Sequence, residues 1–359
     1  MRPSLFDNLP PDQMNWLPYN LRYDDTQLVV DWCHAADGRL EEPFFDQTIH
    51  RLLQLPGHSS RSTHFDALAG INSKKTVCGP GGFIFHMSRC GSTLITQMLG
   101  SLRQLVVFSE PAILEIVLRD TYAPVAVSKE QKKWLLENVI QTLLGYEAGR
   151  QAAFIKFSAR AVLDHALINQ CHPSVPSVFV YREPLEVLVA LVGRQTDQLP
   201  PNLENAGLLN ADPQVIRKMR PAEFWARVLA NECAAALEMC ARAPALLVNY
   251  SQLPEAVWTE IANYCGVVLS LEDIAQMRKL ILRSAKEPGK PFNNDSAAKR
   301  EAATQEMHTL VEHFVRPYYE RLESLRLAVG RHTRGSGSVS GIEGQDAGSD
   351  DHKSLQAGL

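Results

Sequence analysis

The stretch that best predicts the fold of this chain is Phe83-Ile84-Phe85-His86-Met87-Ser88-Arg89-Cys90-Gly91-Ser92-Thr93-Leu94. Its apolar residues are typical of a buried strand, and an amphipathic helix through Ile95, Met98 and Leu99 follows. A strand that turns directly into a helix leaves the first backbone N–H groups of the helix free, and the helix dipole adds partial positive charge there. The stretch therefore predicts a cradle for an anion such as phosphate or sulfate.

Five consecutive residues of this turn are expected to bind the anion. Gly91 lets the backbone approach a ligand closely, and the hydroxyls of Ser92 and Thr93 can donate hydrogen bonds. Arg89 adds a fixed cation with a planar fork of donors. Cys90 stands at a helix N-terminus, where a thiolate is favoured, but no His or Asp partner is identifiable from the sequence, so we interpret it as a packing residue in the cradle.

Four further apolar runs follow the cradle, at 105–108, 153–157, 177–181 and 245–250, and helical segments separate them. Short, continuously apolar strands between helices are typical of a parallel sheet covered on both faces, so the fold class is α/β with three α/β/α layers. Ligands of such sheets bind beyond the carboxyl ends of the strands. The residues whose side chains could bind a ligand or take part in a reaction lie at or just after these ends, namely the cradle, Glu110, Lys156, Arg182 and Tyr250.

Three regions are predicted along the chain. Residues 1–75 carry no chemistry motif and form an N-terminal extension packed on the core, residues 76–329 form the α/β domain with helical insertions, and residues 330–359, rich in Gly, Ser and Asp, form a disordered tail. Within the core, the segment 284–300 carries Lys286 and Lys290 beside Pro and Gly, which indicates a basic loop.

Composition excludes several classes of partner. The 359 residues are 45% hydrophobic and 21% charged with a net charge of −4, so no global field favours nucleic acid or an acidic membrane surface. No apolar run approaches the roughly 20 residues needed to span a bilayer, and no signal pattern is visible at the N-terminus. The seven cysteines form no CxxC pair, which favours a reducing, cytoplasmic compartment.

A P-loop nucleotide triphosphatase is the first candidate for such a cradle. The pattern GxxxxGK[ST] requires a Lys directly before Ser or Thr to neutralise the β and γ phosphates, whereas Gly91 stands before Ser92 here. No strand ends in the isolated Asp expected to hold Mg²⁺, so no metal is predicted. A nucleotide kinase or hydrolase with a degenerate P-loop remains an alternative.

Two motifs resemble those of the sulfotransferase family. The run from Ser88 to Leu94 resembles the family's 5′-phosphosulfate loop, Lys/Arg-Ser-Gly-Ser/Thr-Thr. The strand 178–181 followed by Arg182-Glu183-Pro184 resembles its second hallmark, in which an Arg is followed by a Ser eight residues on and another Arg after four more. Ala190 replaces that Ser, and Arg194 occupies the second Arg position. The resemblance covers residues 80–300 and implies a P-loop-like sulfotransferase core.

The resemblance implies 3′-phosphoadenosine-5′-phosphosulfate as the sulfonyl donor and a hydroxyl or amine of a small metabolite as the acceptor. No His follows Lys156 as in the cytosolic enzymes, so Glu110 is the expected general base, as in the tyrosylprotein and bacterial type. The resemblance also implies roles for cationic residues and for one residue near the nucleotide. These are Lys156 on the bridging oxygen, Arg182 and Arg194 on the 3′-phosphate, Tyr250 near the nucleotide, and Lys286 and Lys290 in a closing basic loop.

Simpler interpretations stay open for several of these residues. Arg182 could form an i,i+4 pair with Glu186 on one helix face, and Lys156 could be a strand-end surface lysine. Glu110 could simply begin a helix, where an acidic residue is favoured. The Ala190 replacement also leaves room for a nucleotide-binding module without activity. The sequence identifies neither the acceptor nor the oligomeric state.

Overall fold

The protein is described here from a computed structural model. The described residues are 15–24, 27–35, 40, 42–56, 59–72, 81–120, 127–146, 150–193, 209, 211–281 and 296–335.

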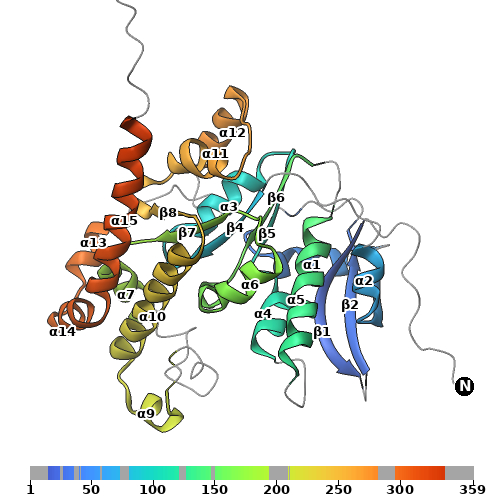
Figure 1. Cartoon of the computed structure of the whole chain (residues 1–359), viewed down its shortest axis with the longest axis horizontal. Helices are drawn as coiled ribbons and strands as arrows, with labels where there is room; N and C mark the ends of the chain where they lie inside the picture. The colour runs from blue at the N-terminus through green and yellow to red at the C-terminus, as the bar shows by residue number, and fades with distance from the viewer. Residues whose placement is uncertain are drawn as a thin grey trace, which may run out of the picture.

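A five-stranded parallel sheet forms the centre of the molecule (Figure 1). Its strands pair in the order β5-β6-β4-β7-β8, so the first strand along the chain lies in the middle. Both neighbours of β4 run parallel to it, which brings the carboxyl ends of all five strands to one edge. The predicted α/β fold with a parallel sheet between helices is confirmed. The strands are β4 (Gly81–His86), β5 (Leu105–Ser109), β6 (Ala152–Lys156), β7 (Ser177–Tyr181) and β8 (Ala245–Asn249).

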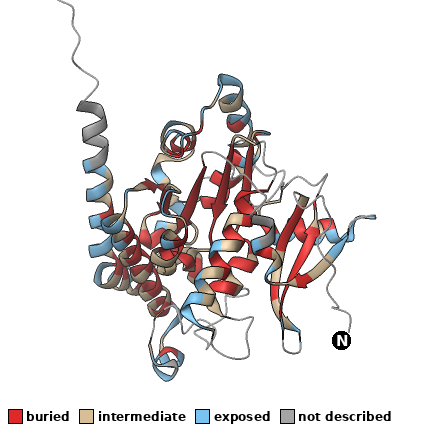
Figure 2. Cartoon of the chain, turned by 45° about the vertical axis from the view of Figure 1, so that its right-hand side comes forward, coloured by how far each residue is buried: buried red, intermediate tan, exposed pale blue. Residues whose placement is uncertain are grey.

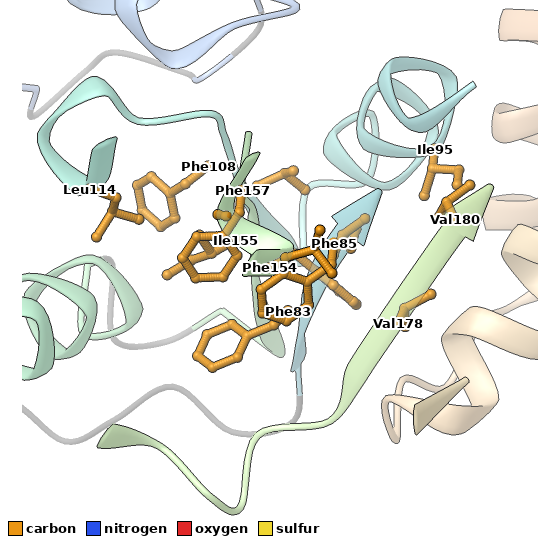
Figure 3. Close-up of a cluster of buried hydrophobic side chains, with 14 of the residues drawn as sticks. Phe83, Phe85, Ile95, Phe108, Leu114, Phe154, Ile155, Phe157, Val178 and Val180 are labelled. Carbon is orange, nitrogen blue, oxygen red and sulfur yellow. The ribbon is translucent and has the colours of Figure 1, made fainter. Parts of the chain in front are cut away.

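The sheet is stable because its strands are buried on both sides. Every residue of β4, β5, β6 and β7 is buried, as expected for strands covered by helices on each face. Phe83 and Phe85 of β4 both pack against the ring of Phe157, the first edge to face and the second stacked (Figure 3). Gly81 is required because a Cβ there would lie 2.0 Å from the carbonyl oxygen of Ala153 on the next strand.

Two groups of helices cover the sheet (Figure 1). The helix that follows β4 contacts β5 and packs with the helices that follow β8. The helices that precede β6, β7 and β8 contact one another on the opposite face. The connection from β4 to β5 runs one way across the sheet and the later connections run the other way, so right-handed crossovers put their helices on opposite faces. The first group is α3 (Ser92–Gly100), η4 (Val257–Ile261), α11 (Ala262–Tyr264) and α12 (Leu271–Ile281); the second is α5 (Lys129–Leu144), η2 (Ala159–Asp164), α6 (His165–Cys171) and α10 (Pro221–Arg242).

The N-terminal region forms a small antiparallel sheet, β1-β2-β3, made of β1 (Trp16–Asp24), β2 (Gln27–His34) and β3 (Ser60–His64). With α1 (Phe45–Gln54) and α2 (Ala67–Asn72), it lies beside the central layers, and β1 contacts α4 (Ala112–Arg119) and α5. Both sheets contain buried residues (red in Figure 2), and these belong to one hydrophobic core. The Tyr146 hydroxyl after α5 donates a 2.9 Å hydrogen bond to the carbonyl of Ala35.

The C-terminal part is helical. The helix α14 (Gln305–Leu310), the π-helical turn η5 (Val311–Val315) and α15 (Arg316–Gly335) follow one another without a break, and Pro317 comes just after the π-helical turn. The segment predicted as a basic loop ends in a helix, α13 (Ser296–Glu301). Helix α15 extends past position 330, and the rest of the predicted tail, 336–359, lies outside the described residues. The remaining elements are α7 (Pro184–Val192), α9 (Pro213–Lys218) and η3 (Tyr250–Gln252).

None of the helices in the described part of the chain has both the length and the apolar character that crossing a bilayer demands.

Candidate functional site

The predicted cradle is built by a tightly curled loop between β4 and α3. Arg89 has φ 60° and Gly91 has φ 89°, so two left-handed residues bend the chain within three positions. Gly91 is the N-cap of α3, which places the N–H groups of Ser92 and Thr93 in the first turn, where a helix supplies them with no acceptor. Such a loop directs successive N–H groups toward one point and forms an anion-binding concavity.

Gly91 has a second reason to be glycine. A Cβ at this position would lie 2.9 Å from a ring carbon of Tyr250 and 2.9 Å from a methyl carbon of Leu253. The loop after β8 is therefore in close contact with the cradle. Tyr250, predicted to lie near the nucleotide, is placed directly beside the glycine turn.

The ends of β5 and β6 supply a buried ion pair next to the cradle. Lys156 is completely buried at the end of β6, and its Nζ lies 2.6 Å from Oε1 of Glu110, which follows β5. The pair lies outside hydrogen-bond geometry, so the buried ammonium has no well-directed acceptor among the described residues. Glu110 has φ 54°, and its N–H donates 2.7 Å to the carbonyl of Lys156. The strained backbone of Glu110 is the kind of feature that clusters at functional sites.

His86, the last residue of β4, is the third charged member of this group. Its Nε2 lies 3.5 Å from Oε1 of Glu110. Burial favours the neutral imidazole, but hydrogen bonding to Cys90 and Glu110 outweighs it and raises the pKa of His86 to about 9. Burial likewise opposes ionisation of Glu110, yet hydrogen bonding to His86 and the charge of Lys156 lower its pKa to about 2. At neutral pH Glu110 is therefore an anion between two cations.

A second cationic group lies at the carboxyl end of β7. Arg182 is 4% exposed, its Nε donates 2.7 Å to Oε2 of Glu186, and its Nη2 donates 3.0 Å to the hydroxyl of Ser296 on α13. Arg300, also on α13, donates 2.8 Å to the other carboxylate oxygen of Glu186. The i,i+4 pair between Arg182 and Glu186 is thus present, and it belongs to a larger network that a distant helix completes.

The two groups are linked by an aromatic ring. The guanidinium of Arg182 lies 4.0 Å from the centre of the Tyr250 ring, the same ring that contacts Gly91. Because β4 and β7 are neighbouring parallel strands, with Met87 N–H donating 2.9 Å to the carbonyl of Val180, their ends are held at one edge. The edge therefore presents two separate positive regions with Tyr250 between them.

The placement of the other predicted residues is mixed. Cys90 is buried with its sulfur against His86, so the histidine neighbour that the sequence did not reveal exists. Ser92 and Thr93 are nearly buried in the first turn of α3. The predicted roles of Arg194, Lys286 and Lys290 cannot be compared with geometry because these residues lie outside the described part of the chain.

The N-terminal region contributes residues that the sequence did not indicate. The ring of Phe44, just before α1, lies 5.2 Å from Nζ of Lys156. Asp46 in the first turn of α1 accepts a 3.3 Å hydrogen bond from the N–H of Ala112, two residues after Glu110. The sequence places His86 on a buried strand, and Ser296 and Arg300 in the predicted basic loop. Nothing in local sequence patterns signals these contacts, since they join segments far apart in the chain.

A buried acid lies beneath the cradle. Glu232 of α10 is 3% exposed, accepts a hydrogen bond from the backbone N–H of Ser88, and has no partner in the described part of the structure for Oε2. Burial raises the pKa of Glu232 to about 8, against the opposing effects of His86 and the Ser88 N–H. No group of three or more His, Cys, Asp or Glu side chains among the described residues could hold a metal ion.

Comparison with known proteins gives distant matches among solved structures. No protein-family model matches the chain, and no curated protein matches it. The solved structures that resemble it include sulfotransferase STF9 from Mycobacterium avium, at 11% identity and a TM-score of 0.44 over 70% of this chain and 80% of that one. The sulfotransferase domain of the Synechococcus olefin synthase has 15% identity and a TM-score of 0.43 over 67% of this chain and 96% of that one. A sulfotransferase from Alicyclobacillus acidocaldarius has 14% identity and a TM-score of 0.40 over 70% and 96%, respectively.

Proposed function

We propose that this protein is a sulfotransferase that moves the sulfonyl group of 3′-phosphoadenosine-5′-phosphosulfate to a hydroxyl or amine of a small metabolite. One observation carries the proposal. The cradle with Lys156 and the network around Arg182 form two positive regions at the same sheet edge, with the Tyr250 ring in contact with both. A nucleotide with anionic groups at its 5′ and 3′ ends and a flat base matches such an arrangement.

The cradle residues fit the 5′ end of this donor. The N–H groups of Ser92 and Thr93 offer hydrogen bonds to an anionic ligand, and Arg89 in the same loop adds a positive charge. The donor, when bound, supplies an activated sulfonyl group whose leaving group is a phosphate. Lys156 is a fully buried ammonium whose contact with Glu110 is not well directed, and in the proposal part of its charge stabilises the leaving oxygen.

Glu110 is the proposed general base. Its carboxylate is ionised at neutral pH, and its side chain is 28% exposed, so a carboxylate oxygen can receive a proton from an acceptor hydroxyl. In the free protein the hydrogen bond from His86 and the ion pair with Lys156 both weaken Glu110 as a base, and only the second can be relieved by a ligand. A ligand oxygen that attracts the ammonium would reduce this effect and raise the proton affinity of Glu110. Binding of the donor would therefore make Glu110 a stronger base.

Arg182 is the proposed ligand of the 3′-phosphate. The Ser that the second family motif would place at 190 is Ala in this chain, and the hydroxyl that lies 3.0 Å from Arg182 belongs to Ser296 instead. Arg300 brings a second guanidinium to the same carboxylate. We include Arg194, Lys286 and Lys290 in this proposal on the family resemblance alone. The free, mostly buried cysteines of the described part of the chain support a cytoplasmic location.

Calorimetric titration of the full chain with adenosine 3′,5′-bisphosphate, and with ATP as the control, tests the donor. We expect saturable binding of the bisphosphate at micromolar concentration and at least tenfold weaker binding of ATP, which lacks the 3′-phosphate. Radiolabelled sulfonyl transfer to a panel of phenols, alcohols and amines then tests catalysis. Mg²⁺-dependent ATP turnover without bisphosphate binding would instead identify a kinase or hydrolase. Tight bisphosphate binding without transfer to any member of the panel, in wild type and Glu110→Gln alike, would indicate an inactive module.

A further inference from the structure

His86 is a buried ionisable residue directly beneath the cradle, and the mechanism above gives it no role. It ends β4, three residues before Arg89, and only 5% of its surface is exposed. The side chain lies at the point where the ends of β4, β5 and β6 meet, because Glu110 and Lys156 are its neighbours from the other two strands.

Both ring nitrogens of His86 face carbonyl oxygens. Nδ1 lies 3.0 Å from the carbonyl oxygen of Met87, and Nε2 lies 3.0 Å from that of Phe157. A carbonyl oxygen only accepts hydrogen bonds, and a neutral imidazole carries one N–H donor and one lone pair. With a neutral ring, one lone pair would face another lone pair at 3.0 Å in a buried site. The two contacts are satisfied together only when both nitrogens carry a proton.

The charges around His86 favour the same state. The groups that face it are Cys90 from the loop, Glu110 after β5, Lys156 at the end of β6 and Glu232 from α10. Lys156 opposes a charged ring, whereas the Glu110 carboxylate, 3.5 Å from Nε2, favours it. With a charged His86, the cations His86 and Lys156 and the anion Glu110 give a net charge of +1 beneath the cradle when Glu232 is a neutral acid.

We infer that His86 is a doubly protonated positioning residue, an imidazolium that joins the carboxyl ends of β4 and β6 and holds the Glu110 carboxylate beside Lys156. Its bond to the carbonyl of Phe157, the residue after Lys156, fixes the strand end that carries the ammonium. Its charge also adds to the positive potential of the cradle. The protonation state does not depend on the proposed function; only the consequence for turnover rests on it.

His165 is a matched control within the same chain. It is as buried as His86, at 2% exposure, but only its Nδ1 has a carbonyl partner, Val162 at 2.9 Å, and its Nε2 has no partner in the described part of the structure. Burial lowers the pKa of His165. The contacts require a charged ring for His86, whereas burial and an Nε2 without an acceptor favour a neutral ring for His165.

Nuclear magnetic resonance of the full chain labelled with ¹⁵N-histidine tests the inference without any ligand. At pH 7.5 we expect both nitrogens of His86 to show the chemical shifts of an imidazolium and those of His165 to show one protonated and one bare nitrogen. The single variants His86→Gln and His165→Gln assign the signals. A neutral His86 at pH 7.5 would overturn the inference whatever reaction the protein catalyses.

A second measurement distinguishes a positioning role from a purely structural one. Glu110→Gln removes the facing carboxylate, so the pKa of His86 should fall by more than about one unit. His86→Gln should lower kcat by about 10- to 100-fold while the affinity for adenosine 3′,5′-bisphosphate changes less than about threefold. His165→Gln should leave both unchanged. If His86→Gln fails to fold, the titration of His86 in wild type and Glu110→Gln still decides, and an unchanged pKa in Glu110→Gln would refute the link to the site.

Discussion

The two positive regions of the site each contain one buried glutamate, and the two glutamates are in opposite states. Glu232 beneath the cradle is 3% exposed and Glu186 beside Arg182 is 2% exposed. Burial raises the pKa of Glu232 to about 8, whereas hydrogen bonds from Arg300, Ser296 and Arg182 overcome burial and hold the pKa of Glu186 below its usual value. Both carboxyls are shielded from solvent, but Glu232 lies deeper in the protein and Glu186 has more donors, so one is a neutral acid and the other an anion.

The two regions also differ in how they are assembled. The cradle end is formed where three neighbouring strands stop, so its geometry is fixed by the sheet itself. The Arg182 end is completed by α13, more than 100 residues away, and the side chain of Arg300 is 65% exposed. We expect the first region to govern turnover and the second to govern the affinity for the donor.

The largest expected effect concerns the buried ammonium of the cradle end. Lys156→Met should lower kcat by roughly 100- to 1000-fold, the usual cost of losing one group that stabilises transition-state charge. The affinity for adenosine 3′,5′-bisphosphate, measured by calorimetry, should change much less. Lys132→Met, which removes a lysine bonded to Asp120 away from the site, is the control. Equal losses of turnover and affinity would place Lys156 in donor binding instead.

Arg182→Ala should weaken the binding of adenosine 3′,5′-bisphosphate by about 10- to 100-fold, because a charged group contributes about 1.5–3 kcal/mol to such hydrogen bonds. Arg227 is the matched control, since it pairs with Glu223 one helical turn away and lies 4.3 Å from the centre of an aromatic ring, Phe314. Arg227→Ala should leave the dissociation constant unchanged. An unaltered dissociation constant in Arg182→Ala would remove the 3′-phosphate assignment.

The two glutamates should respond oppositely to pH. Glu186 has a lowered pKa, so its stabilising contribution is present above the unfolded pKa near 4.3 and is lost as the pH falls through the folded value. Glu232 has a raised pKa, so the folded state binds the extra proton, and stability falls as the pH rises from near 4.3 through about 8. Thermal unfolding should show Glu186→Gln to be less stable than wild type at pH 7, by about 1–3 kcal/mol.

Glu232→Gln, a mimic of the neutral acid, should gain stability relative to wild type as the pH rises from 5 to 9, by an amount on the order of 1 kcal/mol or more. Comparison of the two variants over the same pH series separates charge from burial. If the stability of both variants relative to wild type changed with pH in the same way, Glu186 and Glu232 would not be in opposite charge states.

The smallest expected effect tests the completion of the Arg182 region by α13. Ser296→Ala removes one hydroxyl that lies 3.0 Å from Arg182, so bisphosphate affinity should fall by about 2- to 10-fold with kcat unchanged. Ala190→Ser in the same background restores a hydroxyl on α7, at the position where the family motif has it. Recovery of affinity in the double variant would support an exchange of the hydroxyl between helices, and an affinity as weak as that of Ser296→Ala would argue against it.

Much of the site was visible in local patterns. The strand-loop-helix at 83–94 and the parallel sheet follow from apolar runs, glycine and hydroxyl residues in order along the chain. The predictions that Glu110, Lys156 and Arg182 lie at strand ends are confirmed as positions, because a parallel sheet aligns its carboxyl ends. Their roles in catalysis and binding remain predictions.

Local sequence patterns did not predict the charge states of the buried residues. His86 looked like a core residue because it lies on an apolar strand, and only the carbonyls of Met87 and Phe157, with Glu110 nearby, indicate that it is charged. Phe44 comes from a region in which no chemistry motif was visible, and Ser296 from the predicted basic loop, where Lys286 and Lys290 were the expected ligands; both reach Lys156 and Arg182 only after the chain has folded.

The order of residues alone determined the α/β class and the strand–loop–helix turn, and it predicted an anion cradle at the edge where the strands end, because periodicity and turn residues act over a few positions. The choice of partners around Lys156, Arg182, His86, Glu186 and Glu232 was made by tertiary structure. Electrostatic and hydrogen-bonding partners act through space over a few ångströms, and that distance bears no relation to separation along the chain.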